Sequence, residues 1–241
     1  TRRGELMANP TVVNVTDDFA GAGVTLYEVA LTGANQPSSG HLVVLCASGD
    51  KNITSFGSPT NTTTTSVALF DTQVSLVVAW YVCTGVETSI SGTVGANIAG
   101  ANLAAVELEQ DGTTGTWTVV TSATDNTDDT AVTVWQTGTT GTVTREAIAI
   151  AAFSKDSVNT AGTPTYTNSY TSEYASANGS TQAGLWVASL PVSSGTTSTQ
   201  ITLTGGTADQ MSGAVVVFGK IPTVSPAAGH ASGTGTAHQP S

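Results

Sequence analysis

The chain carries a diffuse internal repeat, and this feature limits its possible folds more than any other. Trp80 and Trp186 lie 106 positions apart, and the apolar runs upstream of them, 41–50 and 147–156, align at the same spacing. Downstream the match continues after an insertion in the second copy, at the turn 193–197. One copy is too small to bury both faces of its strands, so the repeat predicts two related units that share a single core.

Composition predicts an all-β fold. The 241 residues include 44 threonines and 26 glycines, and only 10% of the residues are charged. β-branched side chains favour strands, whereas glycine, asparagine and aspartate clusters favour turns. Helical periodicity is absent from the sequence, and short apolar runs alternate with turn clusters. We therefore expect an antiparallel jelly-roll-like sandwich built from two related halves, at about 40–110 and 145–220.

The ends of the chain differ in composition from its body. We expect an N-terminal arm at 1–10, a sandwich at 11–220 and an extended strap at 221–241, since the strap is rich in glycine, alanine and proline and cannot fold alone. Arg2 and Arg3 form a small basic spot that could dock the arm on an acidic neighbour. A solvated terminus is the alternative interpretation.

Two expected strands, 76–82 and 214–218, are apolar on both faces. A single sandwich covers one face only, so this pattern predicts contact with another subunit. A third strand is expected at 165–170, and 49–65 is expected to be a loop.

Charge and hydropathy exclude several classes of partner. The formal net charge is −11 with only six lysines and arginines, whereas nucleic acid binding requires clustered cations. No apolar run approaches the roughly 20 residues of a membrane span, and no phosphate-binding glycine loop predicts a cofactor. Cys46 and Cys83 are expected to be buried free thiols, with a disulfide left open.

A run of carboxylates is the clearest candidate for catalysis. Glu107, Glu109 and Asp111 would share one face of a strand, and a carboxylate pair about 5 Å apart is what a retaining glycoside hydrolase uses. The alternative, which we favour, is a solvated strand end. His41 is the one histidine in the body, and no nucleophile motif accompanies it.

Metal binding has only weak support in the sequence. Asp125, Asp128 and Asp129 could offer oxygen ligands to calcium, but a polar turn is the default interpretation of such a cluster. His230 and His238 lack the further ligands that a zinc site needs.

Three tyrosines recur every four residues, at Tyr166, Tyr170 and Tyr174. On one strand they would share a face, where aromatic rings could stack on sugar rings and bind a glycan. A cross-strand aromatic ladder or a core edge is the alternative.

The order of these segments resembles that of a known family. The runs 42–46, 79–81 and 90–106, with their weaker second copy, resemble jelly-roll virion proteins of tailed phages, of the minor tail or head-decoration type. The segment 227–238 is similar to the Ala/Gly-Thr-Gly segments of such proteins in phages that infect actinobacteria. The resemblance covers about 40–220. It implies a structural or adhesive role in the virion and supplies no catalytic residues.

The sequence therefore predicts a non-enzymatic phage structural protein on the exterior of the particle. Its expected partners are other virion proteins and further copies of itself in a homo-oligomer. A carbohydrate-binding adhesin for a host-surface glycan is the first alternative, and a jelly-roll glycoside hydrolase is the second.

Overall fold

Strands dominate the part of the chain that the computed structural model describes, namely residues 8–20, 26–49, 53–57, 65–70, 74–94, 100–111, 114–125, 131–156, 162–176 and 183–223. The first half contains β1 (Thr11–Ala20), β2 (Leu26–Ala30), a 3-10 turn η1 (Gly33–Asn35), β3 (Leu42–Gly49), β4 (Ile53–Gly57), β5 (Thr65–Phe70), β6 (Ser75–Val82), β7 (Ser89–Val94) and β8 (Ala101–Glu109). The second half contains β9 (Gly115–Asp125), β10 (Val134–Gln136), β11 (Ala147–Lys155), β12 (Thr163–Tyr166), β13 (Thr171–Ala175), β14 (Gly184–Val192), β15 (Gln200–Thr204) and β16 (Met211–Pro222). The predicted all-β sandwich class is confirmed.

The two halves repeat one strand order. In the first half a five-stranded sheet, β1-β8-β3-β6-β5, faces a three-stranded sheet, β2-β7-β4. The second half has β13-β14-β11-β16-β9 and β10-β15-β12, which is the same order with every strand number raised by eight. The repeat thus includes β1, β2, β9 and β10 and is longer than the alignment predicts. Each half is therefore a two-sheet sandwich by itself, whereas the sequence predicts one sandwich built from the two halves.

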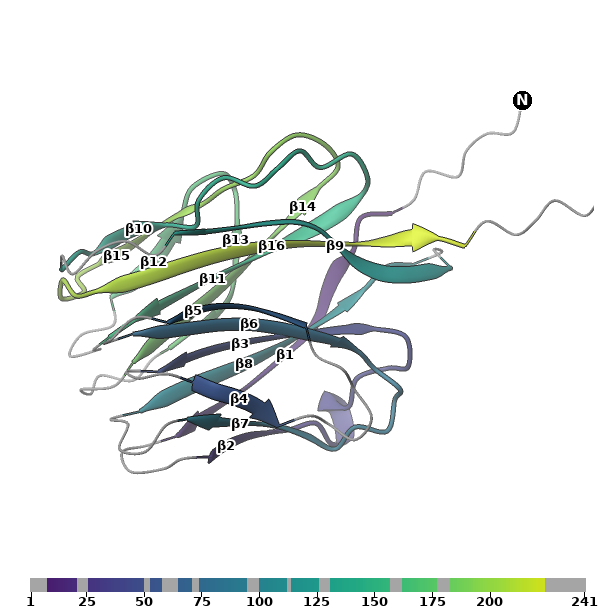
Figure 1. Ribbon diagram of the computed structural model, residues 1–241, viewed down its shortest axis with the longest axis horizontal. Coiled ribbons are helices and arrows are strands. Elements are labelled where there is room, and N and C mark those ends of the chain that lie inside the picture. Colours follow the sequence, from purple (N-terminus) through teal and green to yellow (C-terminus); the bar gives the residue numbers. More distant parts are fainter. Residues whose placement is uncertain are drawn as a thin grey trace, which may run out of the picture.

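Four sheet layers are stacked in the molecule, with the two five-stranded sheets in the middle (Figure 1). They enclose three apolar clusters. One lies inside the first sandwich and includes Leu45 and Ile90, and another lies inside the second and includes Phe153 and Ile201. The third lies between the five-stranded sheets. The prediction of a single shared core is therefore wrong, because each half has its own interior and a separate cluster joins the halves.

The central cluster explains why some strands are apolar on both faces. Leu42 and Val44 of β3 lie in it with Ile148 and Ile150 of β11. Both faces of these strands are buried, as are those of most of β6 and β16. The second apolar face is covered by the other half of the same chain, so the prediction that it contacts another subunit is wrong.

Polar and aromatic contacts also cross the central interface. Trp80 of the first half packs edge-on against Phe218 of the second, with ring centroids 5.3 Å apart and an interplanar angle of 71°. The Asn102 side chain is fully buried, and its amide donates to the carbonyl of Ala183. The hydroxyl of Tyr174 donates to Asn102 Oδ1 at 3.4 Å. These contacts add directional specificity to an otherwise apolar surface.

The two tryptophans that suggest the repeat do not hold equivalent places. Trp80 of β6 is paired with Val44 of β3. The counterpart of Val44 in the second half is Ile150, which is paired with Ser189 and not with Trp186. Trp80 faces the central cluster, whereas Trp186 lies in the interior of the second sandwich. The alignment on tryptophan is therefore wrong by three residues in β14, and an odd shift moves a side chain to the opposite face.

Two local predictions also differ from the structure. The segment 53–57, expected to be a loop, forms β4 on the edge of a three-stranded sheet. The strand expected at 165–170 is interrupted by Asn168 and Ser169, which have positive φ angles of 58° and 62°. Asparagine tolerates this left-handed conformation, and the chain turns there from β12 into β13.

The cysteines are buried free thiols, as predicted. Cys46 lies in the central cluster and Cys83 in the interior of the first sandwich, so the two side chains lie on opposite sides of one sheet. Burial raises the pKa of each thiol to about 12, which keeps both protonated at neutral pH.

Candidate functional site

Both ends of the described chain meet at one end of the molecule, which we call the terminal end (Figure 1). Gln110 lies there with 3% of its surface exposed. Its Nε2 donates to the carbonyl of Ala8 at 2.8 Å, and its Oε1 accepts from the amide of Lys220 at 3.1 Å. The Gln110 side chain therefore holds the first and last described segments of the chain next to each other.

Exposed apolar side chains gather at the terminal end. Among the described residues six large hydrophobic side chains are exposed, and four of them lie here: Val13, Val82, Val86 and Ile221. Strand pairing and turn contacts place them there, because β1, β3, β6 and β8 all begin or end beside Leu42 and Leu108. Exposed apolar groups at one end of a molecule are candidates for a contact surface.

An aromatic ring packs against the last part of β16. Trp117 of β9 donates its indole N–H to the carbonyl of Gly40 at 2.9 Å, and the amine of Lys220 lies 5.1 Å from the centre of its ring. This cation–π contact holds the end of β16 on the body of the molecule.

A histidine lies between the two candidate catalytic carboxylates. Glu107 Oε1 is 2.7 Å from His41 Nδ1 and also accepts from the amide of Ser38 at 2.9 Å. His41 Nε2 lies 3.9 Å from Glu109 Oε2. A hydrogen bond that protonated Glu109 donates to Asp111, burial, and the Asp111 charge raise the pKa of Glu109. The cluster is an acid–histidine–acid chain, with the imidazole of His41 between the two carboxylates.

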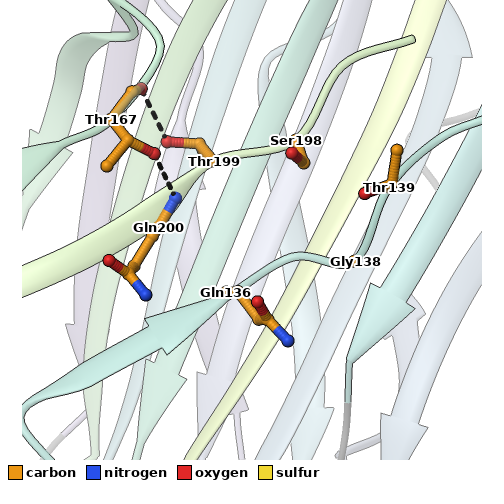
Figure 2. Close-up of a pocket in the computed structure, with 7 residues that line it drawn as sticks. All are labelled: Gln136, Gly138, Thr139, Thr167, Ser198, Thr199 and Gln200. Carbon is orange, nitrogen blue, oxygen red and sulfur yellow. Dashed lines mark hydrogen bonds between the residues drawn. The ribbon is translucent and has the colours of Figure 1, made fainter.

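A second place with convergent polar groups is a groove on the second sandwich, which we call the amide groove (Figure 2). It has a volume of about 290 Å³ and is lined by Gln136, Gly138, Thr139, Thr167, Ser198, Thr199 and Gln200. Gln136 and Gln200 are paired across β10 and β15, so their side chains leave the same outer face of the sheet.

Hydrogen bonds between three segments fix the walls of the amide groove. Thr199 Oγ1 donates to the carbonyl of Thr167 at 3.0 Å, and the amide of Gln200 donates to Thr167 Oγ1 at 2.9 Å (Figure 2). Asn168 Nδ2 donates to the carbonyl of Ser198 at 2.7 Å. Gly138 has a φ of 74°, and a Cβ there would lie 2.9 Å from the carbonyl of Thr124. The shape of the groove is therefore set by the fold before any ligand binds.

The predicted aromatic platform does not form. Tyr166 and Tyr170 pack in the interior of the second sandwich, whereas Tyr174 packs against the central cluster. Burial raises the pKa of all three hydroxyls to about 12. The premise that they share one exposed face is wrong, because the turn at 168–169 divides them between two strands of different sheets.

Several predicted residues lie outside the described part of the chain. These are Arg2, Arg3, Asp128, Asp129, His230 and His238. Asp125 ends β9, and its Oδ2 accepts from Gln136 Nε2 at 2.7 Å. Within the described ranges no group of three or more histidine, cysteine, aspartate or glutamate side chains could hold a metal ion, and no helix there could cross a membrane.

The sequence reasoning missed Gln110, Gln136 and Gln200. Alternation in the run 200–204 indicates that Gln200 points away from the core, but nothing in the sequence pairs it with Gln136. Comparison with protein-family models, curated proteins and solved structures found no match for the chain.

Proposed function

We propose that this chain is a non-enzymatic structural protein of a tailed-phage particle, of the minor tail or capsid-decoration type. In this role it sits on the particle exterior and joins its neighbours through the terminal end. The observation that carries the proposal is the meeting of both chain ends with four exposed apolar side chains at that end. Such a surface suits attachment, since arms and apolar side chains act on the same neighbour.

The rest of the body suits a passive role in assembly. Three apolar clusters join four sheets into one block, so the terminal end is presented on a rigid support. Charged residues are only 10% of the chain. Contacts between hydroxyl-rich surfaces cost less desolvation free energy than contacts between charged ones.

The test uses a phage genome that encodes the chain. Copies per purified particle are counted by quantitative mass spectrometry, and we expect a constant number that survives a high-salt wash. Ile221→Glu should lower that number at least tenfold, because it places a charge in the proposed contact. Leu26→Glu is the matched control, since Leu26 is 48% exposed and Ile221 is 50% exposed.

Two results would contradict the proposal. One is a chain found only in the soluble fraction of the lysate, away from particles. The other is equal incorporation of the Ile221→Glu and Leu26→Glu proteins, which would move the contact away from the terminal end.

A further inference from the structure

The amide groove has a lining of unusual chemical uniformity for so acidic a protein. Its seven residues carry hydroxyls, carboxamides and backbone groups, and none of them is ionisable. The formal charge of the whole chain is −11. The lining thus offers hydrogen-bond donors and acceptors without a charge that would select an ion.

Some of these polar groups make no hydrogen bond to the described part of the protein. The Gln200 carboxamide and the hydroxyls of Thr139 and Ser198 make no hydrogen bond to another described residue, whereas Thr167 and Thr199 use theirs to fix the walls. Gln136 Nε2 is held by Asp125, which orients its carboxamide. The groove therefore combines a fixed frame with free groups, the arrangement that orients a small ligand.

The outer face of the same sheet continues this surface beyond the groove. Thr165 is paired with Thr202, and Thr163 is paired with Thr204. Their side chains leave the face opposite to buried Ile201 and Leu203. Rows of hydroxyls therefore run from the groove along β12 and β15, at the spacing of neighbouring strands, about 4.8 Å.

The first sandwich lacks this feature at the equivalent place. The pair Val29 and Ile90 in the first half corresponds to Trp135 and Ile201 in the second, since both isoleucines are buried. The next pair in the first half is Ala30 and Ser89. It corresponds to Gln136 and Gln200. The repeated fold does not require glutamine there. The two glutamines are a specific property of the second half.

We propose that the amide groove binds a neutral saccharide, whose hydroxyls are held by the carboxamides of Gln136 and Gln200 and by the hydroxyls of Thr139 and Ser198. Neutral sugars fit because each hydroxyl both donates and accepts, as the lining does. Phosphate and carboxylate ligands do not fit, because the lining offers no arginine or lysine to pair with them. The volume, about 290 Å³, lies at the lower limit of ligand pockets, which suits one or two rings of a longer chain.

The test screens the full chain on an array of neutral and acidic oligosaccharides and measures the best neutral binder by titration calorimetry. We expect selective binding of neutral saccharides, with a Kd of about 0.1–1 mM, since the contacts are hydrogen bonds in an open groove. The double variant Gln136→Ala, Gln200→Ser places in the groove the pair that the first half carries. It should keep the wild-type melting temperature and weaken binding at least tenfold.

The control is Gln36→Ala, which removes an exposed glutamine from the first half and should leave binding unchanged. Three results would each overturn the inference: no binding to any neutral saccharide, tighter binding of acidic saccharides than of neutral ones, or a double variant that binds as tightly as wild type. Incorporation into particles is measured separately, so this result does not depend on the structural role proposed above.

Discussion

At the scale of single residues, Glu87 shows how one carboxylate organises a turn. Its two oxygens accept from the amide and hydroxyl of Thr84 and from the amides of Gly85 and Val86, at 2.6–3.0 Å. Gly85 has a φ of 87°, which favours glycine in this turn. Burial alone would raise the pKa of Glu87, but these hydrogen bonds lower it below its ordinary value.

This lowered pKa leads to a pH-dependent prediction. A carboxylate with a depressed pKa in the folded state stabilises the protein fully above the unfolded pKa of about 4.3, and the contribution is lost as pH falls through the folded pKa. Glu87→Gln should therefore lower the free energy of unfolding at pH 7 by about 1–3 kcal/mol. The difference from wild type should shrink below about pH 4.

The measurement is urea denaturation of both proteins across this pH range. Glu28→Gln is the control, because Glu28 is exposed on β2 and its loss should have little effect at any pH. A difference between Glu87→Gln and wild type that stays constant down to pH 3 would contradict the argument.

At the scale of elements, the ends of strands depend on side chains from other strands. β16 is paired with β11 as far as Phe218 and with β9 as far as Pro222. In its last part the amide of Lys220 is bonded to Gln110, next to the end of β8. Gln110 also holds Ala8, so the start of β1 and the end of β16 share one support. These two elements are the first and last of the described strands.

We expect Gln110→Ala to loosen both ends at once. Loss of two buried hydrogen bonds should lower the free energy of unfolding by about 1–3 kcal/mol. Hydrogen exchange followed by mass spectrometry should show faster exchange of the Lys220 amide, while the centre of β11 stays protected. Gln200→Ala should change neither quantity, because the Gln200 side chain is exposed and bonded to no other described residue. Unchanged exchange at Lys220 in Gln110→Ala would show that Gln110 does not support β16.

At the scale of the whole molecule, stability is shared among three apolar clusters. Val43 and Val44 are neighbours on β3, but Val43 faces the interior of the first sandwich and Val44 faces the second half. Both are almost completely buried. Because β3 belongs to two clusters at once, we expect the halves to unfold together.

Paired substitutions test this coupling. Val43→Ala and Val44→Ala should each lower the free energy of unfolding by about 1.5–3 kcal/mol, from lost burial and the cavity left behind. Each should shift a single transition seen identically by circular dichroism and tryptophan fluorescence. Val13→Ala, at an exposed valine, should change stability by less than about 0.5 kcal/mol. Two separate transitions, with Val43→Ala affecting one alone, would show that the halves are independent.

Sequence reasoning located most strands but assigned their faces poorly. Alternation identifies Ile201 and Leu203 as core residues, and both are buried. The prediction of one strand at 165–170 is wrong because the backbone turns at Asn168 and Ser169, where φ is positive. Such a turn leaves only a weak signal in the sequence. Gln136 and Gln200 could not be paired in advance, since 64 residues separate two positions whose contact depends on the register of β10 and β15.

The sequence by itself determined the strand-rich class, the twofold repetition and the burial of both thiols, because these follow from residue type and local periodicity. Only the tertiary structure decided that there are three cores, that Trp80 and Trp186 occupy different layers, and that two glutamines line one groove. The physical reason is the period of two along a strand: a shift of one or three residues in register moves a side chain from one layer to the next. Register is set by packing between strands that are distant in the chain.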